Sequence, residues 1–387
     1  MNTSAKTVLG QLNSLSGNNV RVYGNRCVRV RNRNATCEAC ADVCTTGAIS
    51  VGEHGFEIKE NLCIGCGTCA TACPTCALES LNPTDSDLFE RAYTAMNNNG
   101  GQAVFACASN LDKQFGKIDE SKVCRVTCIG RVDESLIATL KKAGATDICF
   151  VEHGCDTCIH ASGRDTACAV ANSAASILEI WGNPLPITFI DSFPRQIKLN
   201  MPFEADVALP DSDLSYTENN ARIESAPAEN PEQPHLMKTG KNGVLPQYVP
   251  SRRGQLLSTL KDLGPIPSEP VSSRLWATVS IDTNVCGSCR LCAVFCPTGA
   301  LAKFDDRTSA TFGIKHTPGK CVACGTCRDI CPKHAITLLD GVEAADLYDN
   351  SCVTFTMRPR EVEPGKPDTI IRKMRNLLTD SKYVSQA

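Results

Sequence analysis

The sequence predicts a multidomain α+β protein in which two cysteine-rich modules flank a small α/β domain with a parallel sheet. Three observations carry this prediction: a cysteine spacing that recurs near both ends, a central alternation of apolar strand-length runs with helical stretches, and a polar segment rich in Pro, Glu, Asn and Ser. The expected divisions are residues 1–84, 85–200, a linker at 201–272, 273–352 and a polar tail at 353–387. The chain has 25 cysteines in 387 residues, and a chain of this length does not need disulfides for stability, so metal ligation is the better account.

The cysteines of the C-terminal module form two runs with one spacing, C-x2-C-x2-C-x3-C-P. They are Cys286, Cys289, Cys292 and Cys296 in the first run, and Cys321, Cys324, Cys327 and Cys331 in the second. This spacing resembles that of bacterial two-cluster ferredoxins, where three thiolates of a run bind one 4Fe-4S cluster and the fourth binds its neighbour. Zinc is the main alternative for a C-x2-C pair. Zinc sites, however, take their ligands as two pairs rather than as three in series closed by Cys-Pro.

A second module of this kind lies near the N-terminus, where one run is intact and the other is altered. The intact run is Cys63, Cys66, Cys69 and Cys73, and the altered run keeps Cys37, Cys40 and Cys44 in register. Asn34 occupies the first ligand position of the altered run, so we expect Cys27 to supply the missing ligand from an enlarged loop. Alternatively, Cys27 is a buried thiol, and the first cluster holds three irons or takes a non-cysteine ligand.

The central region alternates between two kinds of segment. Apolar runs lie at 103–106, 123–126, 148–151 and 187–190, with helical stretches at 133–143 and 165–181. This alternation predicts a parallel sheet with covering helices. Cysteines follow the first three runs, namely Cys107, Cys128 and the pair Cys155 and Cys158. The carboxyl ends of parallel strands share one edge, so these thiols predict a fifth metal site there. A dithiol use of the C-x2-C pair is the alternative.

Residues 104–163 also resemble the delta, iron–sulfur subunit of methyl-viologen-reducing hydrogenases, most closely at 126–133, 144–147 and 153–155. The resemblance implies a further cluster on Cys107, Cys128, Cys155 and Cys158, with 2Fe-2S preferred to 4Fe-4S. It also implies electron transfer between a hydrogenase or formate dehydrogenase and a flavin-containing protein. This chain has Asn110 where the family has the second cysteine of a pair that begins at Cys107.

Five cysteines remain unassigned, namely Cys76, Cys124, Cys149, Cys168 and Cys352. We expect Cys124, Cys149 and Cys168 to be small buried hydrophobes. We expect Cys76, which replaces a glycine, to pack against a cluster; swapped ligation, with Cys76 as the ligand, is the alternative.

Three further segments carry expectations. Residues 21–33 hold five arginines, which could dock an acidic partner, offset the negative charge of a cluster or form a solvated loop. A short amphipathic helix is predicted at 251–263 within the linker, and another helix at 370–378 in the tail.

The expected function is electron transfer without a catalytic site of the chain's own. The sequence contains no G-x-S-x-G motif, P-loop or dinucleotide-binding loop. Four 4Fe-4S clusters and one further cluster would connect a hydrogenase, formate dehydrogenase or other molybdenum or tungsten enzyme to a flavoprotein or ferredoxin-type partner. An iron–sulfur redox sensor or assembly protein is the alternative.

The remaining expectations concern the setting of the protein. A net charge of −3 with both signs well represented suggests no nucleic-acid surface. No apolar run approaches the roughly 18 residues of a membrane span, and residues 1–20 lack the features of an export signal. A reducing cytoplasm is therefore the expected location, and export alongside a signal-bearing partner is the alternative.

Overall fold

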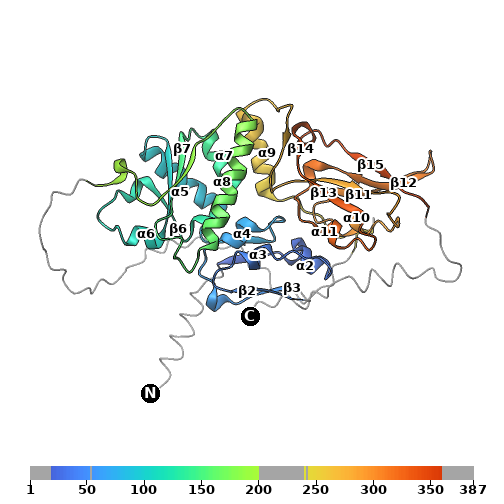
Figure 1. Ribbon diagram of the computed structural model, residues 1–387, viewed down its shortest axis with the longest axis horizontal. Coiled ribbons are helices and arrows are strands. Elements are labelled where there is room, and N and C mark those ends of the chain that lie inside the picture. The colour runs from blue at the N-terminus through green and yellow to red at the C-terminus, as the bar shows by residue number, and fades with distance from the viewer. Residues whose placement is uncertain (1–18, 53–54, 200–238, 241–242, 360–387) are drawn as a thin grey trace, which may run out of the picture.

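The computed structural model describes residues 19–52, 55–199, 239–240 and 243–359. In Figure 1 the parallel-sheet domain lies on the left, the C-terminal cysteine-rich module on the right, and the N-terminal module beneath both. The two cysteine-rich modules flank the central domain in sequence, but in space they touch each other directly: Arg31 of one donates to the carbonyls of Phe295 and Cys296 of the other. Residues 201–238 of the linker expected at 201–272, the tail helix expected at 370–378 and residues 1–18 lie outside the described residues.

The N-terminal module consists of short elements around its cysteines. They are β1 (Val20–Val22), α2 (Val28–Arg31), α3 (Ala39–Asp42), β2 (Ile49–Gly52), β3 (Gly55–Ile58), α4 (Thr68–Ala72) and β4 (Leu78–Ser80). Strands β1 and β4 pair antiparallel, as do β2 and β3. The buried apolar core is small, and most of the side chains packed against it are half-buried cysteines and valines. Such a module depends on its metal for much of its folding free energy.

The central domain has the parallel sheet that the apolar runs predict. Its strands are β5 (Gln102–Cys107), β6 (Val123–Val126), β7 (Asp147–Val151) and β8 (Ile187–Ile190), in the order β6-β5-β7-β8. All neighbouring strands are parallel. The helices are α5 (Asp85–Asn98), α6 (Ala108–Asp112), α7 (Glu134–Lys142) and α8 (Ser162–Ile180), and α7 and α8 lie where helices were predicted.

Helix α5 was not predicted, although the sequence carries its signal. Thr84 and Asp87 form a reciprocal capping box at its start, with Thr84 Oγ1 accepting from the Asp87 amide at 3.2 Å and Asp87 Oδ2 accepting from the Thr84 amide at 3.3 Å. Leu88, Ala92 and Met96, at helical spacing, are buried against the sheet.

Helix α9 (Ser251–Leu263) confirms the helix predicted within the linker. Leu256 and Leu260 are buried in the same apolar core as the sheet, and Leu257 packs against its edge. In Figure 1 this helix lies between the central domain and the C-terminal module. The chain therefore packs on the central domain once more before it enters the C-terminal module.

The C-terminal module contains β9 (Pro270–Val271), β10 (Thr278–Ile281), α10 (Leu291–Phe295), β11 (Leu301–Asp306), β12 (Thr311–His316), α11 (Thr326–Asp329), β13 (Ile336–Leu339), β14 (Val342–Glu343) and β15 (Val353–Thr356). Strand β10 pairs with β13, and β11, β12 and β15 form one sheet. The residues from 353 were expected to begin a polar tail, but β15 continues the module. Phe355 packs against its core and Met357 is buried there, which holds this segment on β12.

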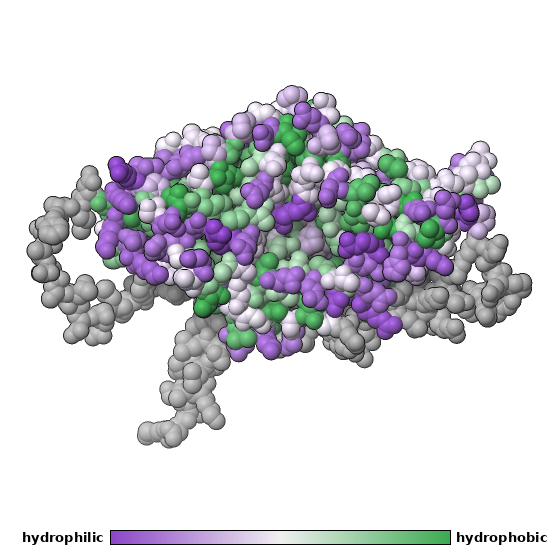
Figure 2. All heavy atoms as spheres, in the orientation of Figure 1, coloured by the Kyte–Doolittle hydropathy of each residue, from purple (hydrophilic) through white to green (hydrophobic). Residues whose placement is uncertain are grey.

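Hydrophilic and hydrophobic residues are intermingled over the face shown in Figure 2. Within the described ranges, no helix is both long enough and apolar enough to span a membrane.

Candidate metal centres

The three intact cysteine runs share one unusual backbone loop. The residues on either side of the second cysteine have positive φ, a region that L-residues other than glycine rarely adopt. These residues are Gly65 (67°), Gly67 (73°), Ser288 (53°), Arg290 (54°), Ala323 (51°) and Gly325 (73°). Ser, Arg and Ala in this conformation are strained, so the loop shape is imposed by its surroundings rather than chosen by these residues.

A second turn follows the fourth cysteine of every run, including the altered one. The residue three positions later has positive φ in each case: Gly47 (63°), Cys76 (47°), Gly299 (73°) and His334 (49°). In three runs the chain then directs a backbone N–H at the fourth sulfur. Ala77 donates to Cys73 Sγ at 3.3 Å, Leu301 to Cys296 Sγ at 3.5 Å and Ala335 to Cys331 Sγ at 3.4 Å. Such donors favour a metal-bound thiolate over a free thiol, because a thiol sulfur is a weak acceptor.

The C-terminal module gathers its thiols into two quartets. The quartets are numbered in chain order, and the first and second belong to the N-terminal module. The third quartet is Cys286, Cys289, Cys292 and Cys331, and the fourth quartet is Cys296, Cys321, Cys324 and Cys327. Burial and then the charge of Cys296 raise the pKa of Cys324 to about 12. Each quartet thus takes three thiols from one run and one from the other, as the spacing predicts.

The N-terminal module forms two quartets in the same manner. The second quartet is Cys44, Cys63, Cys66 and Cys69, and the first quartet is Cys27, Cys37, Cys40 and Cys73. Burial raises the pKa of Cys27 to about 12, and Cys73 and Cys37 are the thiols whose charges raise it further. Asn34, which holds the register position, is exposed. The structure therefore places the Cys27 thiol, not the Asn34 side chain, among the other three thiols.

The central domain brings its four cysteines together at the carboxyl edge of the sheet. The central quartet is Cys107, Cys128, Cys155 and Cys158. Burial raises the pKa of Cys155 to about 12, and the other three thiols are the next causes. Cys158 is exposed, and its sulfur accepts from the His160 amide at 3.3 Å. Asn110 is buried and donates to the Val151 carbonyl at 3.5 Å, so it caps strand β7 from the position where the delta-subunit family has a cysteine.

Two glycines allow helix α8 and its neighbours to approach the central quartet. A Cβ at Gly163 would lie 2.2 Å from Cys128 Sγ, and a Cβ at Gly130 would lie 2.6 Å from the Gly163 carbonyl oxygen. Atoms do not approach this closely, so a side chain at Gly163 would displace the Cys128 sulfur and one at Gly130 would displace the backbone at Gly163. The start of α8 is therefore shaped by the position of the Cys128 sulfur.

The central quartet lies against the second quartet. Cys66 is one of the charges that raise the pKa of Cys128, after burial. Polar contacts hold the two domains together here: Thr45 Oγ1 and His160 Nδ1 share a hydrogen bond of 2.7 Å, and Ser162 Oγ donates to the Val43 carbonyl at 3.0 Å.

The first quartet lies against the fourth across the contact between the cysteine-rich modules. Arg31 donates to the carbonyls of Pro246 at 2.6 Å and Cys296 at 3.3 Å. Thr36 donates through its amide and its hydroxyl to Asp329 Oδ2, at 3.0 and 2.7 Å. A cavity of about 330 Å³ at this junction is lined by Cys37 and Cys73 of the first quartet and by Cys324 of the fourth.

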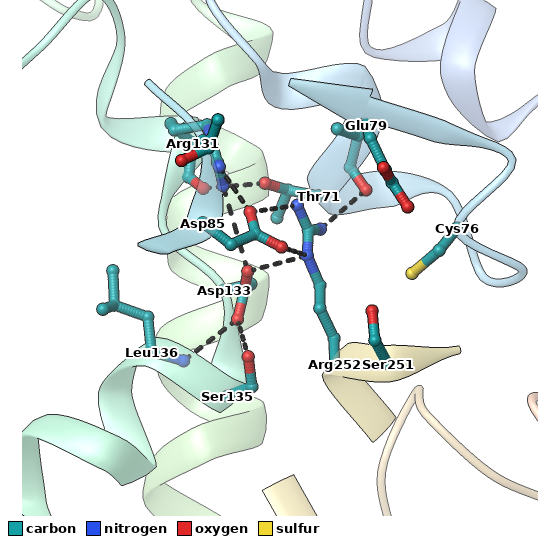
Figure 3. A network of polar contacts seen from close by, with 12 residues as sticks. Thr71, Cys76, Glu79, Asp85, Arg131, Asp133, Ser135, Leu136, Ser251 and Arg252 are labelled. Atoms are coloured by element: carbon teal, nitrogen blue, oxygen red, sulfur yellow. Dashed lines mark hydrogen bonds and ion pairs between the residues drawn. The ribbon is translucent and has the colours of Figure 1, made fainter. Parts of the chain in front are cut away.

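An ion-pair network joins the N-terminal module, the central domain and α9 (Figure 3). Arg252 donates to both carboxylate oxygens of Asp85 at 2.7 and 2.8 Å and to the Ala70 carbonyl at 2.9 Å, and it lies 3.3 Å from Asp133. Burial alone would raise the pKa of Asp85, but Arg252 and Arg131 outweigh it and bring this pKa to about 2.

The cysteines outside the quartets differ in their surroundings. Cys124 and Cys149 are buried in strands, as expected, but Cys168 is only half-buried beside Arg164 on α8, so the prediction of a buried residue was wrong. Cys352 is exposed. Cys76 is buried next to Cys73 and Arg252. The arginines at the module contacts were not identified individually from the sequence, although the basic segment 21–33 was the available signal.

The quartets suit clusters better than single ions. Among the described residues, no three His, Cys, Asp or Glu side chains are placed to hold one metal ion. Each iron of a 4Fe-4S cluster takes only one thiolate. Four thiols that lie near one another without being placed on a single ion therefore fit such a cluster.

Comparisons with known proteins identify the two cysteine-rich modules. Residues 285–335 match the 4Fe-4S dicluster domain family, and residues 56–79 match the 4Fe-4S binding domain family. The chain is 48% identical over 40 residues to electron transport protein HydN of Escherichia coli strain K12 and to the HydN proteins of strains O6:H1 and O157:H7. The matched stretch is 10% of this chain and 23% of each relative. No solved structure matches.

Neither family match extends into the central domain, so the hydrogenase delta-subunit resemblance remains a prediction. The chain is a multidomain α+β iron–sulfur protein with two ferredoxin-type 4Fe-4S domains and a parallel sheet.

Proposed function

We propose that this chain is an electron-transfer subunit with five iron–sulfur clusters, one on each thiol quartet. The first to fourth quartets would each bind a 4Fe-4S cluster, with Cys27 as the ligand that replaces Asn34. The central quartet would bind the fifth cluster, 2Fe-2S in preference to 4Fe-4S. When bound, the clusters supply one-electron chemistry, and the chain supplies their ligands, burial and spacing.

The observation that carries this proposal is the contact of quartets across both module boundaries. The central quartet meets the second through Cys128 and Cys66. The first quartet meets the fourth at Arg31. This arginine follows Cys27 of the first quartet by four residues, and the charges of Cys296 and Cys324 of the fourth quartet act on it. Within each cysteine-rich module, the exchanged fourth cysteine would keep the two quartets adjacent, which the interactions of Cys69 with Cys73 and of Cys292 with Cys296 support. The proposed order is therefore central, second, first, fourth and third.

Such an order makes one continuous conductor that begins in the central domain and ends in the C-terminal module, which lie on opposite sides of the molecule in Figure 1. The outer thiol of the central quartet, Cys158, is exposed, and the neighbouring Ile159 is 82% exposed. A catalytic oxidoreductase such as a hydrogenase, a formate dehydrogenase or another molybdenum or tungsten enzyme could exchange electrons at one end, and a flavoprotein or ferredoxin-type protein at the other. The similarity to a protein named for electron transport supports this class of function, and a reducing cytoplasm remains the proposed setting.

The test is anaerobic reconstitution of the whole chain followed by iron and sulfide analysis. We expect about 18 irons per chain with a 2Fe-2S central cluster, or about 20 with a 4Fe-4S one. Fewer than about 12 irons after full reconstitution, or zinc in their place, would contradict the assignment.

Exposure of Cys158 in the central quartet favours one second candidate, an iron–sulfur redox sensor. An exposed thiol such as Cys158 would make the fifth cluster the most accessible to oxidants. A sensor would lose and regain that cluster at low oxidant concentrations, whereas a conductor would keep it through many turnovers. Isolation of the native complex without oxygen would separate the two, because a conductor should copurify with a catalytic oxidoreductase.

A further inference from the structure

In the part of the chain that the structure describes, two buried arginines have no acidic partner, and both lie beside the fourth quartet. Arg31 is 0% exposed, and its guanidinium donates only to carbonyl oxygens, those of Asn25, Pro246, Phe295 and Cys296. Arg253 is 6% exposed and donates to the carbonyls of Leu275 at 2.8 Å and Gly319 at 3.2 Å. Among the described residues, neither forms an ion pair. A buried charge of this kind is costly unless something nearby is stabilised by it.

Other buried or half-buried arginines are treated differently. Arg131 and Arg252 share Asp85 and Asp133, and Arg274 binds Glu134 through two oxygens at 2.7 and 2.8 Å. Within the described chain, the buried arginines without a carboxylate partner therefore both lie beside the fourth quartet. The thiols that act on Arg31 are Cys296 and Cys324, and the thiol that acts on Arg253 is Cys321, all from the fourth quartet.

The quartets on either side have a different charge environment. Near the third quartet, Arg290 binds Asp305 at 2.8 Å and Lys303 is half-buried, so solvent and a carboxylate offset these cations. The first quartet has acidic neighbours, because Asp329 and Asp42 both act on Cys37. Among the described residues, only the fourth quartet is flanked by buried arginines that have no carboxylate partner, and one of these two cations, Arg31, comes from the N-terminal module.

We infer that Arg31 and Arg253 give the cluster of the fourth quartet the most positive reduction potential of the four 4Fe-4S clusters, so that electrons collect there. The inference rests on the proposed function, since it needs the cluster to be bound. A cluster gains negative charge on reduction, and a fixed positive charge in a low-dielectric site stabilises that state. The cluster would then be the electron store of the relay, positioned where the two modules meet.

The docking of the N-terminal module follows as part of the same device. Arg31 ends helix α2, four residues after Cys27, which lies in the first quartet. The segment that supplies the Cys27 thiol therefore also brings the Arg31 charge to the C-terminal module. The potential of the fourth cluster should depend on this contact.

The test is an anaerobic redox titration of the reconstituted full chain, followed by electron paramagnetic resonance. In the Arg31→Gln and Arg253→Gln variants, the most positive 4Fe-4S component should shift to lower potential. At a fixed applied potential, its ratio of reduced to oxidised cluster should fall on the order of tenfold, about 59 mV for a one-electron couple. Cys324→Ala, which removes a thiol of the fourth quartet, should abolish this same component.

Two controls separate charge from packing. Arg31→Lys keeps the charge and should restore most of the wild-type potential. Arg290→Gln removes an ion-paired arginine of the same module and should leave the most positive component in place. Iron content is measured on every variant, so that a chain without clusters would refute the proposed function rather than this inference.

Three results would overturn the inference. The first is unchanged potentials in both Gln variants with full iron content. The second is equal shifts in the Lys and Gln variants of Arg31. The third is a combined result: both Gln variants lose iron, Arg31→Lys has an unchanged potential, and the most positive component survives Cys324→Ala. This combination would assign the arginines a structural role.

Discussion

The N-terminal and C-terminal modules solve the same ligation problem with different backbones. In the C-terminal module both runs hold three cysteines in loops with positive φ on either side of the second cysteine. In the altered N-terminal run no described residue between Asn34 and Thr46 has positive φ, and the missing thiol arrives from Cys27, outside the run. The tight loop is therefore one way to place three thiols, and a short helix preceding the run is another.

The difference has a structural consequence beyond ligation. Helix α2, which follows Cys27, has no counterpart in the C-terminal runs, and it ends at Arg31 in the contact between the modules. The segment that brings Cys27 to the first quartet thus also carries the arginine that contacts the C-terminal module.

The first way to break the comparison is to remove the displaced thiol. Cys27→Ala should convert one 4Fe-4S cluster to a three-iron form or lose it, a change of about one to four irons per chain. Iron analysis and the three-iron signal in electron paramagnetic resonance measure this. Asn34→Ala is the matched control, because that side chain is exposed, and it should retain all iron. A full complement of iron in the Cys27 variant would show that the fourth ligand comes from elsewhere.

A second variant concerns the central quartet, which lies on neither ferredoxin-type module. Gly163→Ala would place a Cβ 2.2 Å from Cys128 Sγ, so the thiol must move. We expect loss of the central cluster, about two to four irons, while both ferredoxin-type modules keep theirs. Gly254→Ala in α9 meets no atom within 4 Å and should be neutral or stabilising by about 0.5–1 kcal/mol. Unchanged iron content in the Gly163 variant would argue against a cluster on Cys128.

The third prediction tests what holds the N-terminal module in place. Arg252→Met removes the bonds to Asp85 and Ala70 and leaves Asp133 with fewer partners. Because Arg252 is largely buried, the loss should cost about 2–3 kcal/mol of attachment free energy, near the lower end for a buried pair. Faster amide exchange in α4 and α5 would report it. Lys142→Ala, which breaks an exposed pair with Asp262, should cost about 0–1 kcal/mol.

The smallest predicted effect is a difference in acid sensitivity between the modules. His316 of the C-terminal module is 0% exposed, neither ring nitrogen has a hydrogen-bond partner among the described residues, and burial lowers its pKa to about 4. Between about pH 6.5 and pH 4 the unfolded chain binds a proton that the folded chain does not, so stability falls as the pH falls through this window. The described part of the N-terminal module contains no histidine.

We expect the C-terminal module to lose about 1–2 kcal/mol near pH 5 relative to pH 7.5. Thermal unfolding at the two pH values, followed by cluster absorbance, measures this. His316→Asn, which cannot titrate, should remove the part of the pH dependence assigned to this residue. An equal pH dependence in the variant would contradict the assignment.

The sequence by itself determined the features that depend on local spacing. The three intact runs predict their ligand chemistry because the loop that gathers three thiols spans only seven residues, and the comparisons confirm 4Fe-4S domains at 56–79 and 285–335. The four apolar runs predicted β5 to β8, since a buried parallel strand is continuous in apolar residues. Helix α9 was predicted by its leucines for the same local reason.

Only the tertiary structure decided the features that depend on contacts between distant segments. It placed the Cys27 thiol with Cys73, brought Cys66 to Cys128, and buried Arg31 beside Cys296. Strand β15 was not predicted because its pairing with β12 and the packing of Phe355 decide its structure. Spacing along the chain indicates which thiols can share a loop. Which quartets lie next to one another is decided by the surfaces at which the folded modules meet.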